Sequence, residues 1–384
     1  MKILINCLSS VSGGAVSYLC NLAPLLAARF QNAADGHELK FLAHESQSVL
    51  LPSTQKEQLV LIQGARPAGW RRIVWERRNM ARIARELESD VLFTPYQIGP
   101  KAPGVKQVLM LRNMEPFRFM NYRYSFRQGL RNRALRRQSA KALREADRII
   151  AVSDYARNCL IEELGVDANR VRRIYHGRDA SFAPDDAAQE HDGKALKDIG
   201  VNREFILTCG SLLPYRRCED VIAAYGRLTG PSDSELQLVI AGAGIDQRYG
   251  RLIEQTIQAS PARERILAAG HVSREIMAAL YRRCRVCVIA TEIEACPNIA
   301  IEAMASGCAI VSTDRPPLPE IFQDCTLECR ARDIDGLAER MRRCIENEAL
   351  SNDLRKRARD RAAAFSWEKC ADETYSALVD WRGN

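Results

Sequence analysis

The chain has 384 residues, of which 46% are hydrophobic and 27% charged, and its formal net charge is +8. This length exceeds one ordinary domain, and the composition is that of a globular protein rather than a disordered chain. No apolar run approaches the roughly 18 residues of a membrane span, and the apolar start at residues 1–6 is too brief for a secretory signal. The thirteen cysteines are scattered, which favours reduced thiols in a cytosolic protein.

Short apolar runs alternate with helical patterns through the first half of the chain. We expect strands at residues 2–8, 40–43, 59–63, 91–94, 107–111, 148–152 and 172–175. Helices are expected between them at residues 15–29, 70–87, 127–145 and 154–164, the last capped by Ser153. This alternation predicts a parallel sheet covered on both faces, so residues 1–178 are expected to form a first doubly wound α/β domain.

Polar, weakly periodic sequence over residues 179–200 predicts a linker. A second α/β series is expected over residues 201–365. Its strands are predicted at residues 205–209, 236–241, 266–269, 286–290 and 309–312, and its helices at 219–228, 249–259, 274–284 and 300–306. Ser366 is expected to open a last helix within residues 366–384.

Two glutamates eight residues apart, Glu294 and Glu302, accompany a helix of small residues. This spacing also occurs by chance, but Pro297 and Asn298 break the chain before Ile299, as expected where a loop turns into a helix. We expect Glu302 in the first helical turn, where unpaired backbone N–H groups favour negative charge and phosphate. Carboxylates fix sugar hydroxyls through charge-assisted hydrogen bonds, so the arrangement suits a nucleotide sugar.

The segment over residues 294–307 resembles the Glu-x7-Glu signature of the family 4 glycosyltransferases, which are retaining enzymes with the GT-B fold. The chain keeps both glutamates, residues 303–305 (Ala-Met-Ala) and Gly307 of that signature. At residues 295–297, Ala-Cys-Pro replaces the usual Gly-Phe-Gly. The resemblance implies an α/β protein of two doubly wound, Rossmann-like domains facing across a cleft, with the last helix crossing back to the first domain.

The same resemblance implies roles for individual residues. Glu302 is expected to bind the ribose of a nucleotide-diphosphate sugar, and Glu294 is expected to bind the donor sugar. The backbone around Pro297, Asn298 and Ile299 is expected to support the sugar and the phosphate. The nucleotide sugar is then a co-substrate, and neither a cofactor nor an essential metal is predicted.

Three further loops follow predicted strands and are expected to contact the donor. Gly13 and Gly14 follow the first strand, where glycines let backbone amides approach an anion. The loop after residues 205–209 places Ser211 where the family usually has an arginine and Arg216 where it has a lysine. Arg216 is expected to clamp the diphosphate, and Arg217 is a guess for the second cation. In the third loop, Val272 lies in the segment that resembles the family's nucleobase-binding stretch.

A histidine that many relatives carry near the donor sugar has no counterpart, because Arg112 occupies that place. Arg112 and Glu294 are the predicted catalytic residues, although an arginine cannot act as a base at neutral pH. The leaving diphosphate oxygen could accept the proton of the acceptor, with Arg216 stabilising its charge. An Asp-x-Asp pair at residues 333–335 has the spacing of a metal motif but precedes a helix, so we expect it to cap that helix.

Much of the positive charge lies between Arg118 and Arg148. A solvated helix face explains such a cluster equally well, but anionic lipid headgroups or a phosphate-bearing substrate would also bind it. Nucleic acid is not expected, because no nucleic-acid module is recognisable. The residues of this cluster are Arg123, Arg127, Arg131, Arg133, Arg136, Arg137, Lys141 and Arg144.

We therefore predict a retaining glycosyltransferase that moves a sugar from a nucleotide-diphosphate sugar to a glycan or lipid-linked acceptor. Its expected place is cell-surface polysaccharide or glycoconjugate synthesis, in the cytoplasm or on the inner face of the membrane. Two alternatives remain open. One is a nucleotide-sugar epimerase, and the other is a non-catalytic GT-B partner subunit that binds a donor or a glycan.

Overall fold

The computed structural model describes residues 1–11, 13–33, 35–51, 56–64, 69–122, 124, 126–184, 189–228, 236–244 and 246–381. The chain forms two compact units. The first comprises residues 1–119, 126–177 and 366–384, and the second comprises residues 120–125 and 178–365. The C-terminal segment thus returns to the unit that contains the N-terminus.

The first unit is built on a seven-stranded parallel sheet in the order β3-β2-β1-β4-β5-β6-β7. Most residues of these strands are apolar and have buried side chains, as expected for a parallel sheet covered on both faces. In register, Ile3 of β1 lies between Leu39 of β2 and Val91 of β4. The strands are β1 (Lys2–Asn6), β2 (Glu38–His44), β3 (Leu59–Ile62), β4 (Val91–Thr94), β5 (Lys106–Leu111), β6 (Arg148–Ala151) and β7 (Val171–Arg173).

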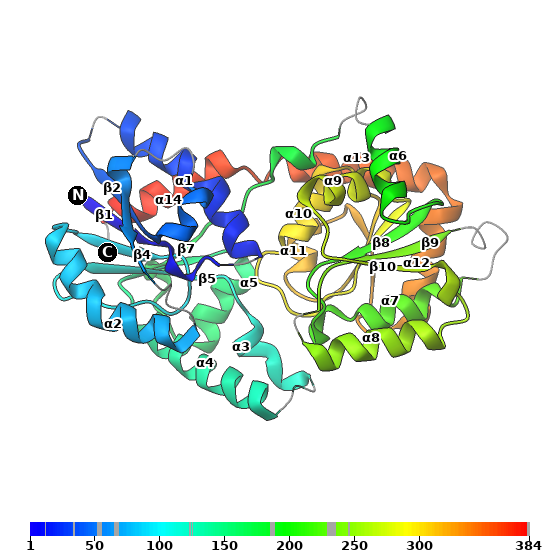
Figure 1. The fold of residues 1–384 in the computed structure, drawn as a ribbon, viewed down its shortest axis with the longest axis horizontal. Coiled ribbons are helices and arrows are strands. Elements are labelled where there is room, and N and C mark those ends of the chain that lie inside the picture. Colours follow the sequence, from blue (N-terminus) through cyan, green and yellow to red (C-terminus); the bar gives the residue numbers. More distant parts are fainter. Residues whose placement is uncertain are drawn as a thin grey trace. The chain divides into compact units, whose positions relative to one another are not determined.

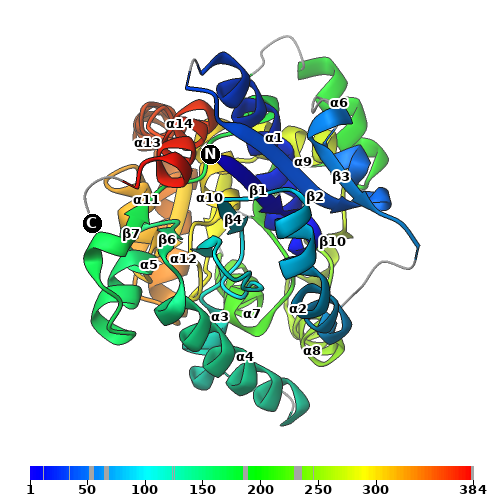
Figure 2. The same ribbon diagram turned by 90° about the vertical axis from the view of Figure 1, so that its left-hand side faces the viewer.

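Helices cover both faces of this sheet. Helices α1 and α14 pack against each other on one face, and α2 and α4 lie on the other (Figures 1 and 2). The chain enters α14 beside Gly177, where a Cβ atom would lie 2.2 Å from the backbone nitrogen of Trp367, so only glycine fits. The helices are α1 (Gly14–Asn32), α2 (Gly69–Glu86), α3 (Glu115–Arg118), α4 (Phe126–Glu145), α5 (Asp154–Asn158, continued by a π turn at Cys159–Glu163) and α14 (Trp367–Val379).

The second unit has a six-stranded parallel sheet in the order β10-β9-β8-β11-β12-β13. The edge strand β13 was not predicted, because it is only four residues long and includes polar and charged residues. At the centre of the sheet, β8 pairs with both β9 and β11. The strands are β8 (Phe205–Cys209), β9 (Gln237–Ala241), β10 (Ile266–Gly270), β11 (Val286–Ile289), β12 (Ile310–Thr313) and β13 (Thr326–Cys329).

Helices α7, α8 and α12 lie on one face of this sheet, and α9, α10 and α13 lie on the other (Figure 1). Helix α6 occupies part of the predicted linker, whose residues 185–188 lie outside the described residues. It packs on α9, where buried Asp192 binds Arg282 at 2.6 and 2.8 Å. The helices are α6 (Gln189–Asp198), α7 (Cys218–Tyr225), α8 (Gln247–Ala259), α9 (Arg274–Arg283), α10 (Asn298–Ala305), α11 (Leu318–Phe322), α12 (Ile334–Glu346) and α13 (Glu348–Ala362).

The predicted fold class is confirmed, since each unit is a parallel sheet with helices on both faces. Among the described residues, no helix is both long enough and apolar enough to span a bilayer.

Candidate functional site

The carboxyl ends of β8, β9 and β10 in the second unit are tied together by glycine-rich loops. The backbone nitrogen of Gly210 donates to Ala241 at 2.9 Å, and that of Gly242 donates to Gly270 at 2.7 Å. Gly242 has φ 156°, and a Cβ atom on it would lie 1.9 Å from the carbonyl oxygen of Gly210. Only glycine permits this approach, so these loops form a closely packed platform at the edge where α/β sheets bind ligands.

Arg216 and Glu294, which the sequence placed in one donor site, are in direct contact. Arg216 lies in a turn that follows β8, and its Nη1 atom donates to Oε1 of Glu294, which follows β11. The two side chains are only 18% and 11% exposed. Burial raises the pKa of Glu294, and the charge of Arg216 opposes that rise. The site therefore holds a half-enclosed ion pair that a phosphate or a sugar hydroxyl could join.

Glu302 does not lie in the first turn of its helix, so this part of the prediction is wrong. Helix α10 begins at Asn298, with Pro297 as its N-cap, and Glu302 is its fifth residue. The helix thus begins two residues earlier in the sequence than the predicted start at residue 300. One carboxylate oxygen of Glu302 lies 3.3 Å from the hydroxyl of Tyr281. Burial raises the pKa of Glu302 to about 7, while Tyr281 and then Arg274 act to lower it.

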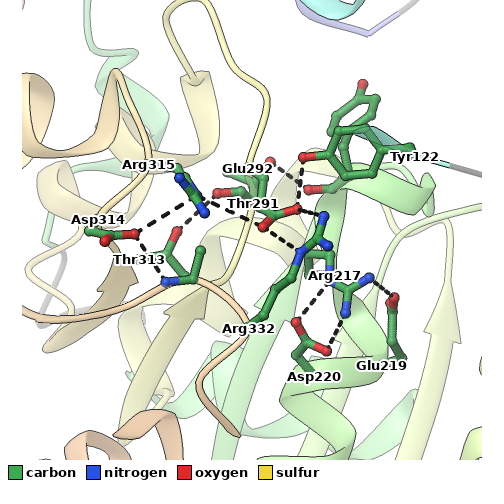
Figure 3. Close-up of polar contacts among 12 residues, drawn as sticks. Tyr122, Arg217, Glu219, Asp220, Thr291, Glu292, Thr313, Asp314, Arg315 and Arg332 are labelled. Carbon is green, nitrogen blue, oxygen red and sulfur yellow. Dashed lines mark hydrogen bonds and ion pairs between the residues drawn. The ribbon is translucent and has the colours of Figure 1, made fainter. Parts of the chain in front are cut away.

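Arg217 is committed to acidic neighbours rather than free for a ligand. Its guanidinium contacts Glu219 at 2.7 Å and makes two bonds to Asp220, at 2.7 and 2.8 Å (Figure 3). Both carboxylates belong to the first turn of α7. Arg217 has φ 52°, in the left-handed region that favours glycine, which is the usual residue of the resembled family at this position. A donor contact by Arg217 remains a prediction and would require these ion pairs to open.

Two other predicted contacts are half-buried on the same edge of the sheet. Ser211 follows Gly210 after β8, and Val272 follows β10 directly before Ser273, the N-cap of α9. They share this edge with Arg216 because β8 and β10 both pair with β9. The structure therefore gathers the predicted residues of the second unit along one edge of its sheet.

A buried glutamate two residues before Glu294 was missed by the sequence reasoning. Glu292 accepts two hydrogen bonds from Arg332, at 2.9 and 3.0 Å, and one from the hydroxyl of Tyr122 at 2.7 Å (Figure 3). Arg315 lies 3.9 Å from it. Burial alone would raise the pKa of Glu292, but Arg332 and Tyr122 lower it, so its side chain, only 3% exposed, is charged. The signal available in the sequence was a second glutamate two residues before Glu294. The hydrogen bonds of Glu292 hold the loop that carries Glu294.

The remaining predicted residues belong to the first unit. Gly13, with φ 55°, is the N-cap of α1, and both Gly13 and Gly14 are exposed, while Ser12 lies outside the described residues. Arg112 follows β5, with its guanidinium 5.7 Å from the ring centre of Tyr96. Its Nη1 atom is buried and has no hydrogen-bond partner among the described residues. Burial lowers the pKa of Arg112 to about 10, so it is a cation at neutral pH.

The Asp-x-Asp pair is a helix cap, as predicted. Oδ1 of Asp333 accepts a hydrogen bond from the backbone nitrogen of Gly336 at 2.9 Å, in the first turn of α12. The thirteen cysteines, all of which are among the described residues, form no disulfide; Cys20 and Cys209 are partly exposed and the others are buried.

A family model described as glycosyl transferases group 1 matches residues 194–361. A second, described as glycosyltransferase family 4, matches residues 12–182. The chain belongs to glycosyltransferase family 4. The two matches cover every strand of both sheets except β1, and they include every loop described above.

Curated relatives agree with this assignment, and solved structures agree with the fold. The chain is 26% identical over 227 residues to the serotype-specific mannosyltransferase WbdA of Escherichia coli, covering 59% of this chain and 28% of that protein. It is 29% identical over 241 residues to glycogen synthase of Mycobacterium tuberculosis, covering 60% and 54%. Anabaena HepE, solved with UDP and glucose, has a TM-score of 0.76 at 16% identity and covers 98% of this chain and 99% of its own. The fold is therefore GT-B, as predicted.

Proposed function

We propose that this chain is a retaining glycosyltransferase that takes its sugar from a nucleotide-diphosphate sugar. The observation that carries the proposal is the half-enclosed Arg216–Glu294 pair on the same sheet edge as Glu302. A half-enclosed guanidinium is suited to phosphate, and carboxylates are suited to sugar hydroxyls. HepE, which shares the fold, holds UDP and glucose in its crystal structure, which supports this choice of ligand.

Each group has a proposed part in donor binding. Glu302 accepts hydrogen bonds from the ribose, Glu294 accepts them from the donor sugar, and Arg216 pairs with the diphosphate. The backbone over Pro297–Ile299 lies at the N-terminus of α10, where the helix dipole favours negative charge. Positive charge for the diphosphate thus comes from the protein, and the proposal needs no essential metal.

The chemical step follows from the same charges. As the bond between sugar and diphosphate breaks, negative charge develops on the leaving oxygen, and Arg216 stabilises it. That oxygen can take the proton of the attacking acceptor hydroxyl, so no side chain has to act as the base. Arg112 is a cation at neutral pH, since its pKa of about 10 lies well above 7. Its proposed contribution is therefore charge and not proton transfer.

The acceptor is proposed to be a glycan or a lipid-linked saccharide, met at an anionic membrane surface. Helix α4 supports this, because Phe126 and Leu130 lie one turn apart and are 83% and 58% exposed. Exposed apolar side chains on a helix rich in arginine are typical of helices that lie on anionic lipid. Arg123 of the predicted basic cluster lies outside the described residues, and α4 carries the others.

Calorimetry with UDP, GDP, dTDP and ADP, without metal, tests the donor site. We expect one nucleotide to bind selectively and Glu302→Ala to weaken it by about 1.5–3 kcal/mol, roughly 10- to 150-fold. Glu254→Ala is the matched control, because Glu254 is an exposed glutamate on α8 of the same unit. Unchanged affinity in a folded Glu302→Ala variant would exclude the proposed ribose contact.

One observation favours the non-catalytic alternative. Ser211 stands where the family usually has an arginine, and the guanidinium of Arg217, the residue predicted to replace that cation, pairs with Glu219 and Asp220. Turnover separates the possibilities. A transferase releases the nucleoside diphosphate and glycosylates an acceptor, an epimerase converts the donor alone, and a partner subunit binds without turnover.

A further inference from the structure

Tyr281 of α9 has no role in the proposed reaction, yet its hydroxyl lies where three elements meet. The side chain is 1% exposed. Its oxygen is 3.3 Å from Oε2 of Glu302 and 3.4 Å from the carbonyl oxygen of Ile299, both in α10. The sulfur of Cys209, at the end of β8, lies 3.1 Å away on another side. One hydroxyl thus connects the end of β8 to the proposed ribose carboxylate and to the first turn of its helix.

The chemistry of a phenol sets the direction of these bonds. Tyr281 has a single proton, and its acceptors are the carboxylate of Glu302 and the carbonyl of Ile299. Both distances are at the long end for such bonds, which is typical of one proton shared between two acceptors. The phenol oxygen can in turn accept from the thiol of Cys209. The three groups therefore form a short chain that ends on Glu302.

We propose that Tyr281 is a positioning residue for donor binding, whose hydroxyl holds the Glu302 carboxylate and the first turn of α10 in the arrangement that the ribose and diphosphate need. This inference rests on the proposed function, because it assigns Glu302 to the ribose. A partly buried carboxylate without a fixed partner would rotate toward the nearest hydrogen-bond donor. With Tyr281 on one oxygen, the other is left for the ligand.

Electrostatics gives the hydroxyl a second effect. Burial raises the pKa of Glu302 to about 7, and the hydrogen bond from Tyr281 is the first of the two contacts that oppose this. The other is the charge of Arg274, also on α9, and the thiol of Cys209 faces the hydroxyl from β8. Loss of the hydroxyl would raise the pKa of Glu302 further. At neutral pH a larger share of the carboxyl groups would then be protonated and less able to accept from the ribose.

Tyr281→Phe removes the hydroxyl and keeps the ring, which packs edge-on against Phe182 with 5.7 Å between ring centres. Tyr225→Phe is the matched control. Tyr225 is 2% exposed in the same unit, and its hydroxyl donates to the carbonyl of Leu236 at 2.6 Å, away from Glu302. A merely structural role for Tyr281 would make the two variants behave alike.

The experiment measures affinity for the nucleotide that the wild type binds, from pH 5.5 to pH 8.5, in both variants and in Glu302→Ala. Tyr281→Phe is expected to weaken binding about 5- to 10-fold at pH 7. It is also expected to shift the midpoint of the affinity–pH curve upward, and Tyr225→Phe is expected to leave that midpoint in place. A midpoint unchanged by Tyr281→Phe, while Glu302→Ala abolishes binding, overturns the inference. Binding that survives Glu302→Ala overturns the proposed ribose contact instead.

A second readout does not depend on any nucleotide. The pKa of Glu302 can be followed by carbon-13 NMR of labelled carboxyl groups, with Glu302→Gln to assign the signal. Tyr281→Phe should raise it, and a pKa equal to that in the wild type would overturn the electrostatic part of the inference.

Discussion

Replacing Glu302 by glutamine should stabilise the unliganded protein at alkaline pH while it weakens nucleotide binding. Glutamine has nearly the same shape and keeps an oxygen that accepts from Tyr281. What it removes is a carboxyl group whose pKa burial raises from the ordinary 4.5 to about 7. The substitution therefore isolates the cost of an ionised, partly buried carboxylate at the proposed ribose position.

The sign of the effect follows from proton binding. Between pH 4.5 and about 7 the unfolded chain releases the proton of Glu302, whereas the folded protein keeps it. The free energy of unfolding therefore falls as pH rises through this window and levels off above it. At about 1.4 kcal/mol for each pH unit, the cost at pH 8 is about 3 kcal/mol. Glu302→Gln should match the wild type near pH 4.5 and exceed its stability by about that amount at pH 8.

The assay must report on the second unit. All four tryptophans, at positions 70, 75, 367 and 381, belong to the first unit, so their fluorescence follows the wrong part of the chain. Urea unfolding followed by hydrogen exchange in peptides from α10 and β12 is suitable, with exposed Glu254→Gln as the control. If the free energies of unfolding of the wild type and Glu302→Gln differed by the same amount at pH 5 and at pH 8, the carboxyl group of Glu302 would not be desolvated in the folded protein.

Three further outcomes are expected. Arg216→Met leaves the carboxylate of Glu294 without its partner and should lower the free energy of unfolding by about 3 kcal/mol. In urea titrations the double variant with Glu294→Gln should recover part of this loss, and no recovery would mean that the two groups are not coupled. Gly242→Ala places a methyl group 1.9 Å from the oxygen of Gly210 and should cost at least about 2 kcal/mol in the same titration, so a variant as stable as the wild type would contradict the described loop packing. Alkylation of Cys209 should slow when the nucleotide is bound, with the other partly exposed thiol as the internal reference in mass spectrometry, and equal labelling rates would place the nucleotide elsewhere.

The sequence by itself determined the elements and the fold class. Buried strands of a parallel sheet are continuous apolar runs, so β4 and β8 were predicted to the residue. Elements without that signal were missed or misread. The short edge strand β13 includes polar and charged residues, and α6 in the predicted linker is stabilised by its packing on α9. Edge strands and docked helices depend on contacts with distant residues, which periodicity does not record.

The motif determined which residues to examine, and only the tertiary structure decided what they touch. Arg216 and Glu294 are 78 residues apart in sequence and make contact because β8 and β11 are neighbours in the sheet. No pattern in the sequence places Tyr281 beside Glu302, because that contact depends on how α9 and α10 pack on one face. Burial follows from the same packing, and it is burial that raises the pKa of Glu302 to about 7.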